Sequence, residues 1–217
     1  MRGTAHRYSD HCSGQKGRKR EFPGIQAKEN RQCSSYFWEE RNIWFSDLWD
    51  LKGTGQKLTD KKVRERSAAF PFELPYRLIN MFSVRGDTVL DPFLGTGTTT
   101  LAAMTSGRDS IGYEIDENFS EIIASELFEK EDFINKVIER RLAKHLIFIE
   151  QRQRNQSKKP VQYKSSYYGF PVMTRQEVNL RLPFIDKITG SENQYEATYL
   201  EELSLTPAQP QKMPLHC

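Results

Sequence analysis

A glycine-rich turn near the middle of the chain, set between a short apolar run and a helical pattern, constrains the fold most. The apolar run is Asp87 to Leu90, the turn contains Gly95 and Gly97, and the helical pattern begins at Thr99. A second apolar run, Ser110 to Glu114, follows the expected helix. Strand, turn, helix and strand form one βαβ unit, so the sequence predicts an α/β fold with parallel strands.

The turn is expected to bind a ligand, because ligands of open α/β sheets lie at the carboxyl ends of the strands. Glycine also lets the backbone approach a ligand closely and adopt positive φ. A phosphate-binding loop of the GxxxxGK[ST] type requires a lysine, and no lysine lies near this turn. A dinucleotide fingerprint requires a third small residue where this chain has Thr100. Neither nucleotide signature is satisfied.

Two carboxylates accompany the turn and narrow the choice of ligand. Glu114 lies at the end of the second expected strand, about 20 residues beyond the turn, where a carboxylate accepts hydrogen bonds from ribose hydroxyls. Asp91 follows the first strand, and its charge would repel pyrophosphate but suits an ammonium or sulfonium group. The pattern therefore favours S-adenosylmethionine over a dinucleotide. The alternative is that the glycines serve only the turn, since such glycine pairs are common.

The chain before this unit has three parts with different patterns. The first 35 residues lack a sustained period and are expected to be loop or disordered. Between Tyr36 and Trp49, aromatic residues recur at short intervals, which predicts strands or an extended segment. After a break at Gly53 and a charged connector, Pro75 is expected to begin a helix whose cap is Gly86.

The chain after the unit begins with strong helical periodicity. Apolar residues from Asn118 to Gln153 follow helical spacing and predict two helices divided near Glu131. Beyond Lys158 the period is lost, and a short strand is expected between Leu180 and Ile188.

Charge, hydropathy and cysteine content restrict the class of protein. The net charge is +3, but basic residues gather between Lys16 and Arg20 and between Lys136 and Lys164. These stretches suit phosphate contacts, and solvated surface explains each about as well. No apolar run reaches the roughly 20 residues that span a membrane, and no signal pattern is present, so we expect a cytoplasmic protein. The three cysteines lack CxxC or nearby histidine spacing, so neither a disulfide framework nor a metal site is expected.

Three motifs resemble a known family when they are taken together and in order. They are Arg66 to Pro75, Val89 to Thr99, and Gly112 to Asp116. The chain between roughly Ile43 and Phe119 resembles the carboxyl-terminal half of the DNA N4-cytosine/N6-adenine methyltransferases with permuted motif order. The resemblance implies an incomplete Rossmann-like, S-adenosylmethionine-dependent methyltransferase fold with a helical carboxyl-terminal extension. It also implies double-stranded DNA as the substrate and a role in restriction-modification.

The resemblance supplies a set of cofactor-binding residues. The segment from Asp91 to Thr98 would wrap the methionine and adenosine portions of S-adenosylmethionine, and Glu114 would hold the ribose. Ala69 to Pro71 would line the methionine end. The full set is Ala69, Phe70, Pro71, Asp91, Pro92, Phe93, Gly95, Thr96, Gly97, Thr98 and Glu114.

The sequence patterns and the resemblance together suggest three regions. Residues 1–35 form a basic, disordered segment, residues 36–130 form the S-adenosylmethionine-binding α/β part, and residues 131–217 form a helical and then irregular extension.

The family presents its target amine with an Asp/Asn/Ser-Pro-Pro-Tyr/Phe loop, and this chain has no Pro-Pro pair. Asp91 to Phe93 imitates the loop but belongs to the cofactor motif, so no catalytic residue is assigned. The permuted order places the loop upstream of Met1, and a chain without it would expose sheet edges and apolar faces. We therefore expect either poor solubility or a partner, which would be a complementary methyltransferase half. The chain is then a gene fragment, a subunit of a split enzyme or, third, an inactive DNA- or cofactor-binding relic.

Overall fold

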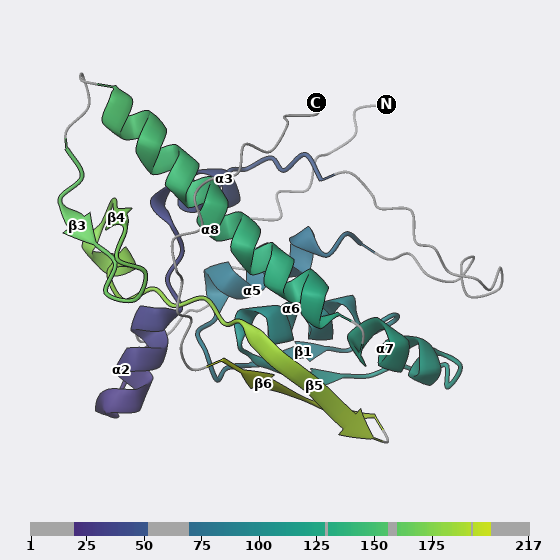
Figure 1. The fold of residues 1–217 in the computed structure, drawn as a ribbon. Helices are drawn as coiled ribbons and strands as arrows, with labels where there is room; N and C mark the ends of the chain where they lie inside the picture. The colour runs from purple at the N-terminus through teal and green to yellow at the C-terminus, as the bar shows by residue number, and fades with distance from the viewer. Residues whose placement is uncertain (1–19, 52–69, 129, 156–159, 192, 201–217) are drawn as a thin grey trace, which may run out of the picture.

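The structure is a computed structural model that describes residues 20–51, 70–128, 130–155, 160–191 and 193–200. It is mixed α/β, as the sequence predicts (Figure 1). No helix among the described residues is both long and apolar enough to cross a membrane. The elements in chain order are α2 (Gly24–Cys33), α3 (Trp38–Trp44), α5 (Glu73–Phe82), β1 (Thr88–Asp91), α6 (Thr98–Ser106), β2 (Asp109–Gly112), α7 (Phe119–Phe128), α8 (Glu131–Arg154), β3 (Tyr163–Lys164), β4 (Pro171–Val172), a 3-10 helix (Arg175–Glu177), β5 (Ile185–Ser191) and β6 (Gln194–Tyr199).

The predicted βαβ unit is confirmed. Strands β1 and β2 pair in parallel, with Thr88 opposite Asp109 and Asp91 opposite Gly112, and α6 connects them. Helix α6 ends at Gly107, whose φ of 70° is the left-handed conformation in which glycine commonly terminates a helix.

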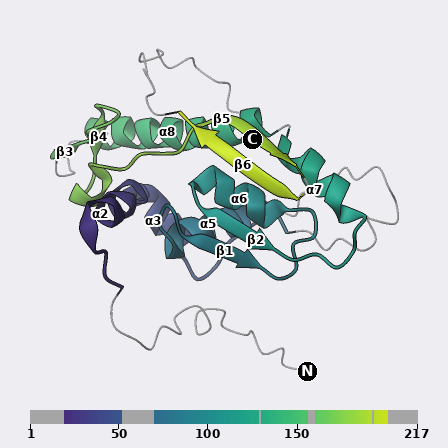
Figure 2. The same cartoon turned by 90° about the horizontal axis from the view of Figure 1, so that it is seen from below.

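The elements around α6 are layered. Helix α6 lies between the β1–β2 pair on one side and α8 on the other (Figures 1 and 2). Helix α5 packs beside α6, and Val89 of β1 packs against the cluster that these two helices form. One face of the β1–β2 pair is therefore covered by helices.

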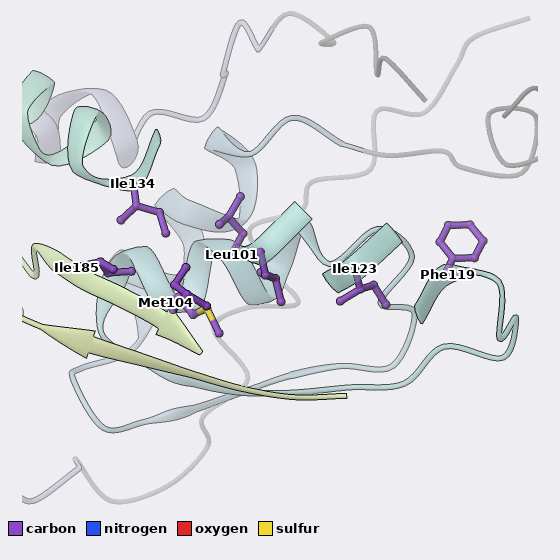
Figure 3. Packing of buried hydrophobic residues seen from close by; sticks show 8 residues of the cluster. Leu101, Met104, Phe119, Ile123, Ile134 and Ile185 are labelled. Atoms are coloured by element: carbon purple, nitrogen blue, oxygen red, sulfur yellow. The ribbon is translucent and has the colours of Figure 1, made fainter. Parts of the chain in front are cut away.

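The largest core cluster joins the βαβ unit to the carboxyl-terminal elements (Figure 3). Leu101 and Met104 of α6 and Ile123 of α7 meet Ile134 of α8 and Ile185 of β5. The hairpin of β5 and β6 is also fixed to α8 by polar contacts. The Asn135 side chain donates to the Ile185 carbonyl and accepts from the Ile185 N–H, both at 2.9 Å.

Two expectations for the amino-terminal region are wrong. The segment expected to be loop or disordered contains α2 in its described part, and the aromatic segment expected to be extended forms α3. Helix α3 is stabilised at its start, where the Glu40 carboxylate accepts the Phe37 N–H at 2.9 Å. Aromatic residues at its two ends contact distant parts of the chain: Phe37, directly before the helix, stacks on His145, and Trp44, its last residue, contacts Tyr76 edge-on. They are spread around a helix and do not alternate along a strand.

The remaining differences between the predicted and the observed elements concern where the elements begin and end. Helix α5 begins at Glu73, so Pro75 is its third residue, and the helix ends at Ser83, so Gly86 is not its cap. Gly86 instead adopts a φ of 75° in the turn before β1. The strand expected from Leu180 begins only at Ile185, and its partner β6 was not predicted. The break at Gly53 and the charged connector lie outside the described residues.

Candidate functional site

The glycine turn lies between the end of β1 and the start of α6, and it is fixed to the end of β2. The Tyr113 N–H donates to the Asp91 carbonyl at 2.9 Å, and the Leu94 N–H donates to the Tyr113 carbonyl at 2.9 Å. Gly95 and Gly97 have φ values of 54° and 82°, as expected for glycines that turn the chain sharply. The turn therefore has a defined shape at the carboxyl ends of both strands.

Two close approaches explain why small residues occupy this region. A Cβ added to Gly97 would lie 3.3 Å from the Ile123 side chain of α7. A Cβ added to Gly112 would lie 2.6 Å from the Leu94 side chain, which fills the space above the end of β2. The turn, the second strand and α7 are consequently packed in direct contact.

Asp91, Gly95 and Glu114, which the sequence assigns to one site, lie together in the structure. One oxygen of the Glu114 carboxylate accepts the Gly95 N–H at 2.8 Å. The other accepts the N–H groups of Ile115 and Asp116 at 2.9 and 3.0 Å. The Asp91 carboxylate accepts the Phe93 N–H at 3.0 Å, which shapes the first half of the turn. Glu114 is exposed, so its carboxylate is accessible to a ligand.

The remaining residues of the turn that were predicted to bind the cofactor lie in the same segment, between Asp91 and the start of α6. Pro92 and Phe93 are exposed, while Thr96 is buried and its hydroxyl lies 3.3 Å from the hydroxyl of Thr98 at the start of α6. These residues form the outer surface and the floor of the turn, respectively.

The expected methionine-end residues are not seen to reach the turn. Pro71 accepts the Leu74 N–H at the start of α5, and Phe70 is exposed. Within the described ranges, no hydrogen bond or ring contact joins either Phe70 or Pro71 to the turn. Ala69 lies outside the described residues. The role of this segment stays a prediction.

A cleft of about 950 Å³ opens beside Glu114, between the end of β2, α7 and the hairpin strand β6. Cavities that bind small molecules commonly have this size. The sequence did not reveal the contribution of β6, although Tyr195, Ala197 and Tyr199 alternate as strand residues do. The lining residues are Leu94, Thr100, Met104, Gly107, Arg108, Asp109, Ser110, Gly112, Tyr113, Glu114, Asp116, Glu117, Ser120, Ile123, Asn193, Gln194, Tyr195, Glu196, Ala197 and Tyr199.

The lining of the cleft is predominantly acidic. Five carboxylates line it, those of Asp109, Glu114, Asp116, Glu117 and Glu196. The lining cation, Arg108, is buried, and its guanidinium donates to Ser83 and Ser106. Burial lowers the pKa of Arg108 to about 10, so the side chain remains charged at neutral pH. An acidic cleft of this kind suits a ligand that carries positive charge better than a polyphosphate.

A second polar cluster lies away from the turn and involves α3, α8 and the 3-10 helix. Possible metal-ligand atoms of Glu39, His145 and Glu177 lie within 4.8 Å of one another. The two ring nitrogens of His145 are 2.8 Å from Glu39 and 3.0 Å from the Pro171 carbonyl, and Glu177 accepts the Trp38 N–H at 2.8 Å. These hydrogen bonds connect four elements, α3, α8, β4 and the 3-10 helix, which accounts for the cluster structurally.

Comparison with known proteins finds DNA methyltransferases as relatives of this chain. A family model described as DNA methylase matches residues 10–125. The type II methyltransferase M.MthZI of Methanothermobacter thermautotrophicus is 48% identical over 186 residues, which are 84% of this chain and 50% of that protein. The type II methyltransferase M.MjaI of Methanocaldococcus jannaschii is 54% identical over 97 residues, 45% of this chain and 31% of that protein. The chain thus spans half or less of the length of these relatives.

A solved structure is also similar over part of the chain. It is a DNA modification methylase of Thermus thermophilus in complex with S-adenosylmethionine, with 35% identity and a TM-score of 0.41. The similarity covers 51% of this chain and 39% of that one.

Proposed function

The chain belongs to the N6/N4 DNA methylase family, and from this premise we propose that it is the S-adenosylmethionine-binding part of a site-specific DNA methyltransferase. The acceptor is the exocyclic amine of a base, cytosine N4 or adenine N6, in double-stranded DNA. The relatives are type II methyltransferases, so the corresponding biological role is restriction-modification.

One observation carries the proposal: the Glu114 carboxylate lies against the glycine turn at the carboxyl end of a parallel strand pair. Glu114 is the residue expected to hold the ribose of the cofactor. A carboxylate has about four acceptor sites, and three backbone N–H groups occupy three of them. One site remains for a ribose hydroxyl, and a second becomes free if the Gly95 N–H turns away when the cofactor binds.

The charge and shape of the site fit the same cofactor. Asp91 places a carboxylate beside the turn, and the acidic cleft continues from Glu114 toward β6. Both features favour a ligand with a cationic ammonium and sulfonium over one with a pyrophosphate. When bound, S-adenosylmethionine supplies an electrophilic methyl group on its sulfonium. The contribution of this chain is to bind and orient that donor.

We assign presentation of the target base to residues that this sequence does not contain. The sequence lacks a Pro-Pro-aromatic loop, and the chain matches half of M.MthZI. We infer that methyl transfer requires the complementary methyltransferase half, which would orient the flipped-out base against the donor.

Calorimetric titration with S-adenosylmethionine tests the cofactor site. Asp91→Ala and Glu114→Ala are each expected to weaken binding about tenfold or more, because a lost hydrogen bond to a charged group is worth roughly 1.5–3 kcal/mol. Glu121→Ala, which removes an exposed carboxylate on α7, is the matched control and should bind like the wild type. Thermal unfolding verifies that each variant is folded. Equal affinity in all four proteins would refute the site.

A further inference from the structure

The loop that carries Glu114 connects β2 to α7, and its hydrogen bonds lead directly into the helix. The Glu114 carboxylate accepts the N–H groups of the next two residues, Ile115 and Asp116. The Asp116 carboxylate in turn accepts the backbone N–H of Asn118 at 3.1 Å and its side-chain amide at 2.6 Å. Helix α7 begins at the next residue, Phe119. The position of Glu114 beside the glycine turn therefore depends on where α7 begins.

Helix α7 also lies against the glycine turn. A Cβ added to Gly97 would be 3.3 Å from the Ile123 side chain, so the helix and the turn are in direct contact. Phe119 and Ile123 belong to the largest core cluster (Figure 3), which also contains Ile188 of β5. A displacement of α7 would consequently change both the turn and the loop that carries Glu114.

The hairpin of β5 and β6 contacts α7 at two further points. At the start of the helix, the Ser120 hydroxyl donates to the side-chain carbonyl of Asn193 at 2.6 Å. At its end, the Phe128 ring contacts the Tyr195 ring of β6 edge-on, with 5.4 Å between the ring centroids. Ser120 and Asn193 both line the cleft beside Glu114. The hairpin therefore holds α7 in place from the far wall of the cleft.

The backbone of Asn193 suits this contact. Asn193 has a φ of 67°, and it is the only non-glycine residue with a positive φ in the described part of the chain. Asparagine adopts this left-handed conformation more readily than most residues. Asn193 lies in a turn directly before β6, so its side chain extends from a paired strand. Glycine at this position would remove the hydrogen-bond acceptor and still allow the same backbone conformation.

We propose that the β5–β6 hairpin is part of the cofactor site and that Asn193 is a positioning residue. It acts through Ser120 and α7 on the carboxylate of Glu114. This proposal rests on the proposed function, in which Glu114 binds the ribose of S-adenosylmethionine. The matching family model covers residues 10–125 and ends before the hairpin. The hairpin is therefore a support for cofactor binding that lies outside the matched family region.

Calorimetric titration of the full chain with S-adenosylmethionine measures the effect on binding. Asn193→Gly should weaken binding about two- to tenfold, the range that corresponds to one lost hydrogen bond. Ser120→Ala should weaken binding equally, and the double variant should bind no more weakly than either single variant, because both changes remove the same hydrogen bond. Asn193→Asp retains an acceptor and should bind like the wild type. Ser125→Ala is the matched control, since the Ser125 hydroxyl donates within α7, to the Ile122 carbonyl.

Amide hydrogen exchange of the full chain without ligand separates positioning from a general loss of stability. Asn193→Gly should raise the exchange rates of the Ile115 and Asp116 amides, which donate to Glu114, by about two- to tenfold. The exchange rates of α5 should be unchanged. An equal rise in α5 would mean that the variant only destabilises the chain, and it would overturn the positioning role.

Three results of the titration would also overturn the positioning role. These are wild-type affinity in both Asn193→Gly and Ser120→Ala, losses that add in the double variant, and binding by Asn193→Asp that is as weak as by Asn193→Gly. Failure of the proposed function looks different. A wild-type chain that does not bind S-adenosylmethionine refutes the proposed function, whereas the exchange rates of Ile115 and Asp116 still decide whether Asn193 positions the loop.

Discussion

Gly97 illustrates how much a single backbone position determines in this molecule. It has a φ of 82°, it precedes α6, and its missing Cβ leaves room for Ile123. Gly97→Ala should therefore lower the stability by more than the roughly 1–2 kcal/mol of a left-handed alanine. Gly24→Ala is the matched control, because Gly24 has a φ of 80° but nothing within 4 Å of its Cβ position. Urea unfolding of both variants checks this; equal losses would mean that the Ile123 contact has no effect.

Asp87 is the residue from which we expect a pH-dependent contribution to stability. Its hydrogen bonds from the Arg20 guanidinium, at 2.6 and 2.7 Å, together with the Val84 N–H, lower the pKa of its carboxyl group. Because this pKa is lowered in the folded state, the ionised carboxylate stabilises the protein above the unfolded pKa of about 3.9. The stabilisation is lost as the pH falls through the lowered pKa of the folded state. Arg20 is half exposed, so solvent and salt reduce the effect.

Thermal unfolding between about pH 2 and 7 tests this contribution. Asp87→Asn should be less stable than the wild type at neutral pH and should lose less stability on acidification. Asp47→Asn, at an exposed aspartate, is the control and should follow the wild-type curve. Parallel curves for Asp87→Asn and the wild type would show that the Asp87 carboxylate makes no pH-dependent contribution to stability.

At the scale of elements, a buried ion pair connects α3 to α8 and α5. The Arg141 guanidinium donates to the Glu40 carboxylate at 2.6 and 2.7 Å and to the Tyr76 hydroxyl at 2.8 Å. Burial opposes the charge on Arg141, but the Glu40 carboxylate and Tyr76 raise its pKa above the ordinary value. The Arg141 guanidinium therefore remains charged at neutral pH.

Removing one partner of this pair should lower the free energy of unfolding strongly. Arg141→Met is expected to cost about 3–5 kcal/mol of unfolding free energy, because it leaves the Glu40 charge buried and unpaired. Adding Glu40→Met should recover part of the loss. Arg154→Met is the control, since Arg154 forms an exposed pair with Glu150 that is worth about 0.5 kcal/mol or less. Urea unfolding measures all three, and a loss no larger than that of the control would refute the role of the pair.

The sequence predicted elements whose signals are local and missed those that depend on distant partners. The βαβ unit follows from apolar spacing and from Gly95, Gly97 and Gly107, which act within a few residues of their own position. Helix α3 was missed because its partner Arg141 lies 101 residues from Glu40 in the sequence. Strand β6 becomes clear only when it pairs with β5, which α8 anchors.

One part of the candidate site could be predicted from local sequence, and another part could not. Glu114 was predicted from its distance to the turn, and the structure places it beside Gly95. The cleft beyond it is bounded by β6, about 80 residues further along the chain, so no local pattern could assign that wall.

At the scale of the whole molecule, α8 presents a basic stripe that is expected to contact DNA. Lys136, Arg140 and Lys144 are exposed and four residues apart, so they lie along one face of the helix. Each phosphate contact contributes about 0.9 to the salt dependence of binding. Replacing all three with alanine should therefore reduce the slope of log affinity against log salt concentration by up to about 3.

Fluorescence anisotropy with a duplex oligonucleotide over a salt series measures this slope. Lys28→Ala with Lys187→Ala, at exposed lysines on other elements, is the control and should leave the slope unchanged. An unchanged slope in the triple variant would remove α8 from the DNA interface.

We expect this chain to hold the methyl donor for a DNA methyltransferase that a second half completes. Transfer of a labelled methyl group from S-adenosylmethionine to duplex DNA, by the chain combined with the complementary half of M.MthZI, tests it most directly. We expect transfer by the pair, none by either half alone, and a loss of transfer with Glu114→Ala but not with Glu121→Ala. Transfer by the complementary half alone, or transfer by the pair that is unaffected by Glu114→Ala, would contradict it.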